Sequence, residues 1–342
     1  MAEHNGTRRL KLGIIGCGLA VKYLHWPALK QMQDKYEIVM TCDTDSKAAQ
    51  EVMQLAGVNV PSTPDYHKLL VADNVEVVLS SLPIELSAPV MMDAIRAGKH
   101  IIGEKPLAAN WQEAVELVKV AAASPQVVVE IAENYHYRDD FKQARRWMDE
   151  GKIGPVFLVE LESKAWTDPT ASFAQTPWRH QAHVNYRGGV IADAAVHHAA
   201  GLRELAGDVK QVQAYTRAIN PIMAAPDTIT ANLLFKNGVL GNLSYSGATH
   251  EAGAKSAEAT IYGEQGTITV NGGKVVLKRP DQPDETIKTG HSDNGYYKEF
   301  ANFWEAVVNG APVVSTPQAA LRDWEIIMKA LDSAESGQTI NF

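Results

Sequence analysis

The segment that most constrains the fold is an apolar run over residues 10–18 that ends in the glycine turn Gly16-Cys17-Gly18. A buried strand that enters such a turn lets the backbone approach a dinucleotide pyrophosphate without side chains in the way. Residues 19–30 have a helical pattern, so the anion would lie at a helix N-terminus among free N–H groups. A second apolar run ends in Asp43, about 20 residues after the turn, where an acid that binds the ribose belongs. This order predicts a nicotinamide-dinucleotide site.

Size and charge exclude several classes of protein. A chain of 342 residues with 45% hydrophobic content is expected to form two domains. Its net charge of −8 provides no basic field for nucleic acid or anionic lipid. No apolar stretch reaches the roughly 20 residues that a membrane span needs, and residues 1–9 lack the apolar core of a secretion signal. With only Cys17 and Cys42 present, both expected to be buried, we predict a cytoplasmic protein without nucleic-acid or membrane partners.

The first part of the chain alternates apolar runs with amphipathic stretches, which is typical of a parallel sheet covered by helices on both faces. The expected strands are residues 10–15, 37–42, 75–82, 99–103 and 127–132, and the expected helices are 19–33, 46–56, 86–97 and 110–123. We therefore predict an α/β Rossmann-type domain over residues 1–132.

The pattern changes after this domain to α+β. One helix over 141–150 is followed by β-rich runs at 156–163, 209–217, 228–235, 238–246, 257–262, 266–270 and 274–278. Turns such as Lys236-Asn237-Gly238 and Asn271-Gly272-Gly273 separate several of them, as hairpins require. Residues 133–342 should thus form a second domain with a large, mostly antiparallel sheet. Its closing helices, 296–309 and 317–336, could pack back on the first domain.

Lys105 is the first candidate for chemistry. The sequence Glu104-Lys105-Pro106 follows an expected strand, at the edge of the sheet where a nicotinamide would lie. An ammonium group there could polarise a substrate hydroxyl or carbonyl and stabilise an alkoxide. Taken alone, the same three residues also fit an ordinary solvated loop.

Asp193 and His197 are the second candidates. On a helix they would share a face, and a carboxylate that holds an imidazole makes a general base. The alternative is a surface ion pair of a few tenths of a kcal/mol. The apolar neighbours favour burial, yet spacing alone leaves both interpretations open.

Histidines and aromatic residues gather near these positions. His180, His183, Asp193, His197 and His198 could be considered as metal ligands, but no pair has the spacing of a helical metal site, so we expect no metal. Stacking rings with hydrogen-bonding groups often hold hydroxylated substrates. The candidates for substrate binding, each of which could instead pack at the domain junction, are Tyr135, His136, Trp178, Arg179 and His180.

Together these segments resemble the glucose–fructose oxidoreductase / inositol dehydrogenase / MocA (Gfo/Idh/MocA) family. The matching stretches run in the family's order along nearly the whole chain: 13–18, 25–29, Cys42-Asp43, 97–107, Trp178-Arg179, Gly188-Gly189 through Asp193 and His197, and 333–337. The Glu-Lys-Pro and Asp-x-x-x-His segments are the specific ones, whereas many dehydrogenases share the glycine turn.

The resemblance implies an open-faced sheet in the second domain, through which family members form homodimers or homotetramers. It also implies that Lys105, Asp193 and His197 surround the reacting carbon. The cofactor-binding residues that we predict are Gly16, Gly18, Leu19, Ala20, Asp43, Pro83, Glu104 and Lys105.

Two positions depart from the family's pattern. Val21 stands where a third small residue is usual, and Ser87 where many members carry histidine. Asp43 favours the 2′-hydroxyl of NAD, and no arginine follows it directly to accept a 2′-phosphate. NAD is therefore the predicted cofactor, with NADP not excluded.

We accordingly predict an NAD(P)-dependent oxidoreductase that acts on a hydroxyl-bearing carbon of a sugar, cyclitol or related polyol. In this prediction His197, held by Asp193, removes the hydroxyl proton, and Lys105 bonds the same oxygen. Two alternatives use the same fold. An NAD-dependent glycoside hydrolase would need the same residues, while a dinucleotide sensor without catalytic activity would not need the lysine or the Asp/His pair.

Overall fold

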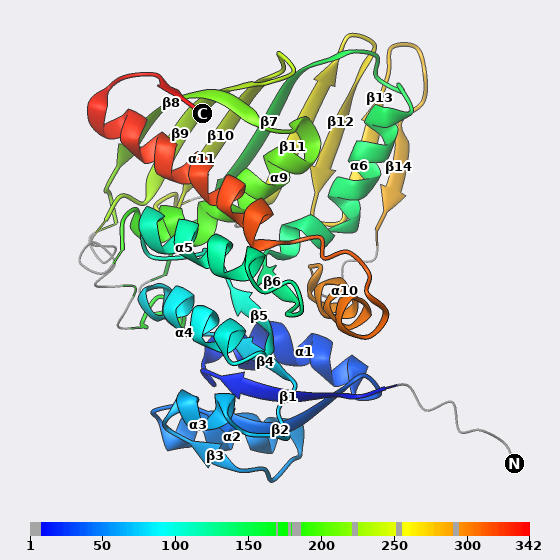
Figure 1. Cartoon of the computed structure of the whole chain (residues 1–342). Helices are drawn as coiled ribbons and strands as arrows, with labels where there is room; N and C mark the ends of the chain where they lie inside the picture. The colour runs from blue at the N-terminus through cyan, green and yellow to red at the C-terminus, as the bar shows by residue number, and fades with distance from the viewer. Residues whose placement is uncertain are drawn as a thin grey trace, which may run out of the picture. The chain divides into compact units, whose positions relative to one another are not determined.

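The computed structural model describes residues 8–168, 170–176, 179, 186–220, 225–250, 255–289 and 294–342, without the side chains of 255–257. Within it the chain forms two compact units (Figure 1). The first contains Met1–Ala132 and Tyr296–Leu321, and the second contains Glu133–Gly295 and Arg322–Phe342.

The first unit is built on a six-stranded parallel sheet in the order β3-β2-β1-β4-β5-β6. Its strands are β1 (Leu10–Ile15), β2 (Tyr36–Cys42), β3 (Ser62–Thr63), β4 (Val77–Ser80), β5 (His100–Glu104) and β6 (Val129–Ala132). Apart from the exposed Lys11, strand β1 is apolar and buried, as a strand covered on both sides requires. This order is that of a doubly wound sheet, whose ligands bind beyond the carboxyl ends of the strands.

Helices cover both faces of this sheet. The helical segments are η1 (Val21–His25), α1 (Trp26–Leu29), η2 (Lys30–Met32), α2 (Ser46–Ala56), α3 (Tyr66–Leu70), α4 (Ile84–Arg96), α5 (Trp111–Ala122) and α10 (Tyr296–Asn309). On one face Leu12 and Ile14 share a buried core with Val21, Phe300 and Phe303. On the other face, a Cβ on Gly13 would lie 2.8 Å from Leu69 of α3, so the helix packs directly on the backbone.

The second unit contains a nine-stranded sheet in the order β14-β13-β12-β11-β7-β10-β9-β8-β15. All neighbours are antiparallel except β7 and β10. The strands are β7 (Val156–Lys164), β8 (Val209–Arg217), β9 (Thr228–Phe235), β10 (Leu240–Ser246), β11 (Lys255–Gly263), β12 (Gly266–Asn271), β13 (Lys274–Lys278), β14 (Glu285–Lys288) and β15 (Ile340–Asn341).

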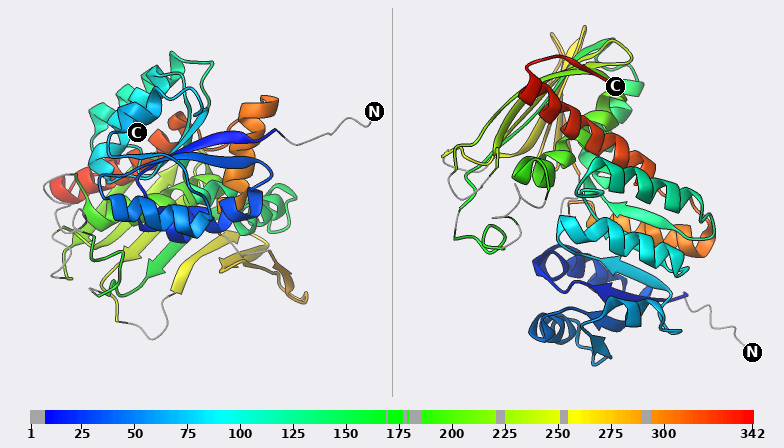
Figure 2. Two further views of the ribbon diagram at one scale, coloured as in Figure 1. Left: turned by 90° about the horizontal axis from the view of Figure 1, so that it is seen from below. Right: turned by 60° about the vertical axis from the view of Figure 1, so that its left-hand side comes forward.

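One face of this sheet packs against helices, as both views of the unit show (Figures 1 and 2). The segments are η3 (Asn134–Tyr137), α6 (Asp139–Asp149), η4 (Ile191–Ala195), α9 (Val196–Ala206) and, from Arg322 onwards, α11 (Pro317–Ser336). Burial alternates along β8 and β9 with the period of two expected for a sheet that is covered on one face. Phe157 and Tyr215 are 50% and 61% exposed, which marks the open face.

The predicted fold class is confirmed. The structure differs from the sequence pattern in several places: residues 21–32 form consecutive π, α and 3-10 segments instead of one α-helix, and β3, α3, β14 and β15 were not expected. Both cysteines are buried thiols, as expected. Among the described residues no helix is long and apolar enough to cross a membrane.

Candidate active site

The glycine turn has the backbone geometry that a bound pyrophosphate requires. Gly16 has φ +83°, and a Cβ there would lie 2.1 Å from the carbonyl oxygen of Ser81, so another residue would displace the neighbouring strand end. A Cβ on Gly18 would meet no atom within 4 Å, which leaves space for a ligand over the turn. Leu19 and Ala20 begin the helical run that follows, and the N–H groups of a first helical turn have no partner within the helix.

Asp43 is tied to this turn. Its Oδ2 accepts a hydrogen bond from the Cys17 N–H at 2.7 Å, and its Oδ1 accepts one from the Asp45 N–H at 2.8 Å. Each oxygen keeps a lone pair, so the carboxylate can still accept the hydroxyls of a ribose. The turn and the acid therefore fit an NAD molecule.

Lys105 follows β5, and Pro83 precedes α4 after β4, both at the carboxyl edge of the parallel sheet. Glu104 fixes the backbone there: its Oε2 accepts the Lys105 N–H at 3.2 Å, and its Oε1 lies 2.6 Å from Nε2 of His25. His25 is fully buried at the end of the π-helical turn η1, where the rings of Tyr296 and Phe300 meet its ring edge-on. The sequence identified neither this pair nor a role for His25.

His25 lies at the end of a π turn that is followed by Pro27. Proline has no N–H to continue an α-helix, and the N–H of Trp26 bonds the carbonyl of Val21, five residues back. Val21, which stands where the family's pattern usually has a small residue, lies in this π turn. Its side chain is buried in the core.

Among His136, His197 and His198 of the second unit, His197 has the most exposed imidazole. Its Nδ1 lies 2.6 Å from Oε1 of Glu133, which also accepts the Tyr135 N–H at 3.1 Å. A carboxylate only accepts, so Nδ1 carries the proton and Nε2 is left as an acceptor, with no partner among the described residues. The Tyr135 ring stacks on the imidazole at 5.0 Å and 19°. The Glu133 side chain is 2% exposed and that of His197 18%, so a buried carboxylate holds a partly accessible imidazole.

The prediction that Asp193 holds His197 is wrong. Asp193 pairs instead with Arg179, whose Nε donates to Oδ2 at 2.9 Å. The physical reason is local: Ile191–Ala195 is a π turn, in which residues four apart no longer align as in an α-helix. Arg179, expected to bind substrate, is held by Asp193 and by Oγ1 of Thr176 at 2.9 Å.

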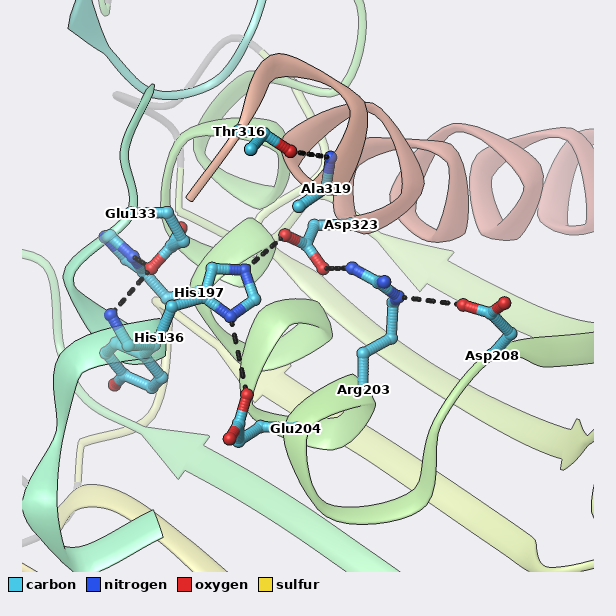
Figure 3. Close-up of polar contacts among 10 residues, drawn as sticks. Glu133, His136, His197, Arg203, Glu204, Asp208, Thr316, Ala319 and Asp323 are labelled. Carbon is cyan, nitrogen blue, oxygen red and sulfur yellow. Dashed lines mark hydrogen bonds and ion pairs between the residues drawn. The ribbon is translucent and has the colours of Figure 1, made fainter. Parts of the chain in front are cut away.

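His136 has both ring nitrogens on carboxylates (Figure 3). Nε2 donates to Oδ2 of Asp323 at 2.8 Å, and Nδ1 lies 3.7 Å from Oε2 of Glu204. Burial alone would lower its pKa, but the hydrogen bond to Asp323 and the nearby Glu204 carboxylate prevail and raise the pKa to about 10. Because no ring nitrogen is left for a ligand, we reassign His136 from substrate binding to a buried ion cluster.

His198 follows His197 on α9, and its ring lies 5.7 Å from that of Tyr245. Burial lowers the pKa of His198 to about 3, so this imidazole is neutral, and its Nε2 has no hydrogen-bond partner among the described residues. Burial also raises the pKa of Tyr245, and the charge of Asp193 adds to the effect. Tyr135 is likewise buried, so its contribution is the ring that covers His197.

Three of the predicted residues remain outside the part that the structure describes: Trp178, His180 and His183. Among the described residues, no group of three or more His, Cys, Asp or Glu side chains could hold a metal ion.

Comparisons with known proteins give a consistent result. The family model described as "Oxidoreductase family, NAD-binding Rossmann fold" matches residues 10–131, and the "GFO/IDH/MocA C-terminal domain" matches 141–269. The uncharacterized protein YMR315W of Saccharomyces cerevisiae is 31% identical over 313 residues, which cover 87% of each chain.

The chain belongs to the Gfo/Idh/MocA oxidoreductase family. Its first unit is the NAD-binding domain of that family. An oxidoreductase from Thermotoga maritima has the same fold, with a TM-score of 0.89 and 30% identity over 98% of each chain. The inositol 2-dehydrogenase/D-chiro-inositol 3-dehydrogenase of Lactiplantibacillus plantarum is 27% identical over 170 residues, 49% of this chain and 47% of the relative.

Within this Gfo/Idh/MocA chain, Glu133 is the partner of His197 that sequence reasoning missed. One signal was present: an acid directly follows strand β6, where the carboxyl ends of parallel strands form the ligand site. Its partner could not be predicted, because 64 residues separate it from His197.

Proposed function

We propose that this protein is an NAD-dependent dehydrogenase or reductase that acts on a secondary hydroxyl of a sugar, cyclitol or related polyol, with His197 as the general base. The observation that carries the proposal is the Glu133–His197 pair, which fixes the proton on Nδ1 and leaves Nε2 as an acceptor. An inositol dehydrogenase among the relatives supports the substrate class.

In the oxidative direction Nε2 of His197 removes the proton of the substrate hydroxyl. The imidazolium that forms is stabilised by the buried Glu133 carboxylate at 2.6 Å, because a nearby opposite charge in a poorly solvated site favours the charged ring. The stacked ring of Tyr135 keeps the imidazole in one orientation. When bound, NAD supplies the hydride acceptor at nicotinamide C4.

Asp193 and Lys105 have different roles in this proposal. Asp193, neutralised by Arg179, orients the segment just before His197 and is no longer the partner of the imidazole. Lys105 keeps the role that the resemblance implies, which is to stabilise the developing alkoxide with its ammonium group. Glu104 contributes by fixing the Lys105 backbone.

NAD is proposed over NADP because of Asp43. Its carboxylate is held by two backbone N–H groups, so it cannot swing away from a 2′-phosphate, and two negative charges would face each other. A clearly lower KM for NAD than for NADP is expected, and equal KM values would contradict this preference. The homodimer or homotetramer and the cytoplasmic location stay predictions.

A substrate screen tests the function. Purified protein is mixed with NAD, and separately with NADP, and a panel of inositols, aldoses, sugar acids and aryl glycosides, while NADH absorbance and aglycone release are followed together. NADH formation with one ring polyol, lost in the His197→Ala variant, is the expected result. Aglycone release without net NADH would replace the proposal with the glycoside hydrolase, and NAD binding with neither signal would favour the sensor.

A further inference from the structure

The cluster around His136 lies two turns along α9 from His197 (Figure 3). Positions 197 and 204 are seven residues apart on this helix and therefore share a face. Glu133 and His136 are three residues apart across the 3-10 turn η3, so their side chains lie on the same side of this turn. The contacts between these two elements are reciprocal: Glu133 bonds His197, and His136 pairs with Glu204.

We propose that His136 is a positioning residue: held between Asp323 and Glu204, it fixes the turn η3 along α9 and so keeps the Glu133 carboxylate on Nδ1 of His197. The inference rests on the proposed role of His197 as the base. The closing helix α11 takes part in this positioning, because its Asp323 is fully buried and pairs with His136.

The charges around His136 support a ring that stays charged. Asp323 faces it from α11, Glu204 from α9 and Glu133 from its own segment. Arg203 of α9 bonds the other oxygen of Asp323, and Asp208 in turn bonds Arg203. The positive charges of Lys142 and Arg145, both on α6, lie close enough to Glu204 to favour its charged form.

Two cations, His136 and Arg203, thus balance two anions, Asp323 and Glu204, at the centre of the cluster. Such a balanced buried cluster holds one geometry, whereas removal of one member leaves an uncompensated charge. The pKa of about 10 means that the cluster stays assembled over the whole range in which His197 would work as a base.

The test is histidine ¹⁵N NMR on the full chain, with His136 and His197 assigned through His136→Gln and His197→Gln. The wild type should show one ring that stays doubly protonated to about pH 10, and a His197 ring with its proton on Nδ1. Asp323→Asn should let His136 deprotonate near neutral pH and turn His197 into a mixture of tautomers. With a substrate in hand, kcat should fall roughly 10- to 100-fold, the cost of a base displaced by about 1 Å, with an unchanged KM for NAD.

Asp208→Asn is the matched control, because it removes a carboxylate of the same network that does not touch His136. It should leave both rings and kcat as in the wild type. Glu204→Gln removes the charge of the more exposed partner of His136 and repeats the test. It replaces Asp323→Asn if circular dichroism shows that the latter variant does not fold.

The inference is overturned if His136 loses its proton in Asp323→Asn or Glu204→Gln while His197 keeps its Nδ1 proton and kcat. Failure of the proposed function is separate: His197→Ala would then keep its activity, whatever the tautomer spectra show.

Discussion

Each of the two units contains a histidine on or just after a π-helical turn, bonded at 2.6 Å to a glutamate at the end of a parallel strand. His25 and Glu104 form this pair in the first unit, and His197 and Glu133 form it in the second. The strands β5 and β6 that lead to the two glutamates are neighbours in the sheet. The same arrangement of a histidine and a glutamate therefore occurs twice in one chain.

The difference between the pairs is the exposure of the second ring nitrogen. His25 bonds through Nε2, is 0% exposed, and leaves Nδ1 buried without a partner. His197 bonds through Nδ1, and its side chain is 18% exposed. A proton acceptor must reach a substrate, so only the second arrangement can perform general base catalysis. The His25–Glu104 pair can only stabilise the fold.

The largest effect should come from His197→Ala. We expect kcat to fall by roughly 10²- to 10⁴-fold, because a positioned general base is lost. NAD affinity, measured by fluorescence titration, should stay nearly unchanged, because the glycine turn lies in the other unit. A loss of NAD binding together with kcat would mean that His197 is structural and would break the comparison.

His25→Ala should act on stability instead. The substitution leaves a cavity and a poorly solvated Glu104 carboxylate, so the free energy of unfolding should fall by about 2–4 kcal/mol in urea denaturation. His67→Ala, an exposed position on α3 of the same unit, is the control and should change it by less than about 0.5 kcal/mol. Unchanged stability with a loss of kcat equal to that of His197→Ala would show that His25 is also chemical.

Glu133→Gln sharpens the comparison. The amide oxygen can still accept a hydrogen bond from the Nδ1–H group but carries no charge to stabilise the imidazolium, so kcat should fall by about 10- to 100-fold. Glu104→Gln, its counterpart, should reduce kcat less, because its partner His25 is not the proposed base. Equal losses of kcat in the two variants would contradict the assignment.

The stability of the fold should also depend on pH through His198. Its pKa is lowered to about 3 in the folded protein, so the unfolded chain binds a proton first as the pH falls below about 6.5. The stability that the neutral ring contributes is complete above that pH and is lost towards pH 3, by about 1.4 kcal/mol per unit. As the pH falls from about 6.5 towards 3, the difference in unfolding free energy between the wild type and His198→Gln should therefore shrink. A pH-independent difference would show that this ring is not kept neutral by burial.

Much of the first unit was predictable because its signals are local. The glycine turn, Asp43 and the alternating runs lie within short segments, and the structure has the expected parallel sheet. The π turns were not predictable from apolar spacing, which is nearly the same for a single π turn and an α-helix. For that reason the expected partner of His197 was wrong.

The sequence by itself determined the family, the doubly wound sheet and the residue types at the site, since these depend on short patterns of hydrophobicity and glycine. The tertiary structure alone decided which carboxylate holds which histidine. Glu133 meets His197 across 64 residues and His136 meets Asp323 across 187, and a hydrogen bond at 2.6–2.8 Å depends on how whole elements pack. Burial then gave the paired histidines different properties, because the pKa and the accessibility of a ring depend on what surrounds it and not on its neighbours in the chain.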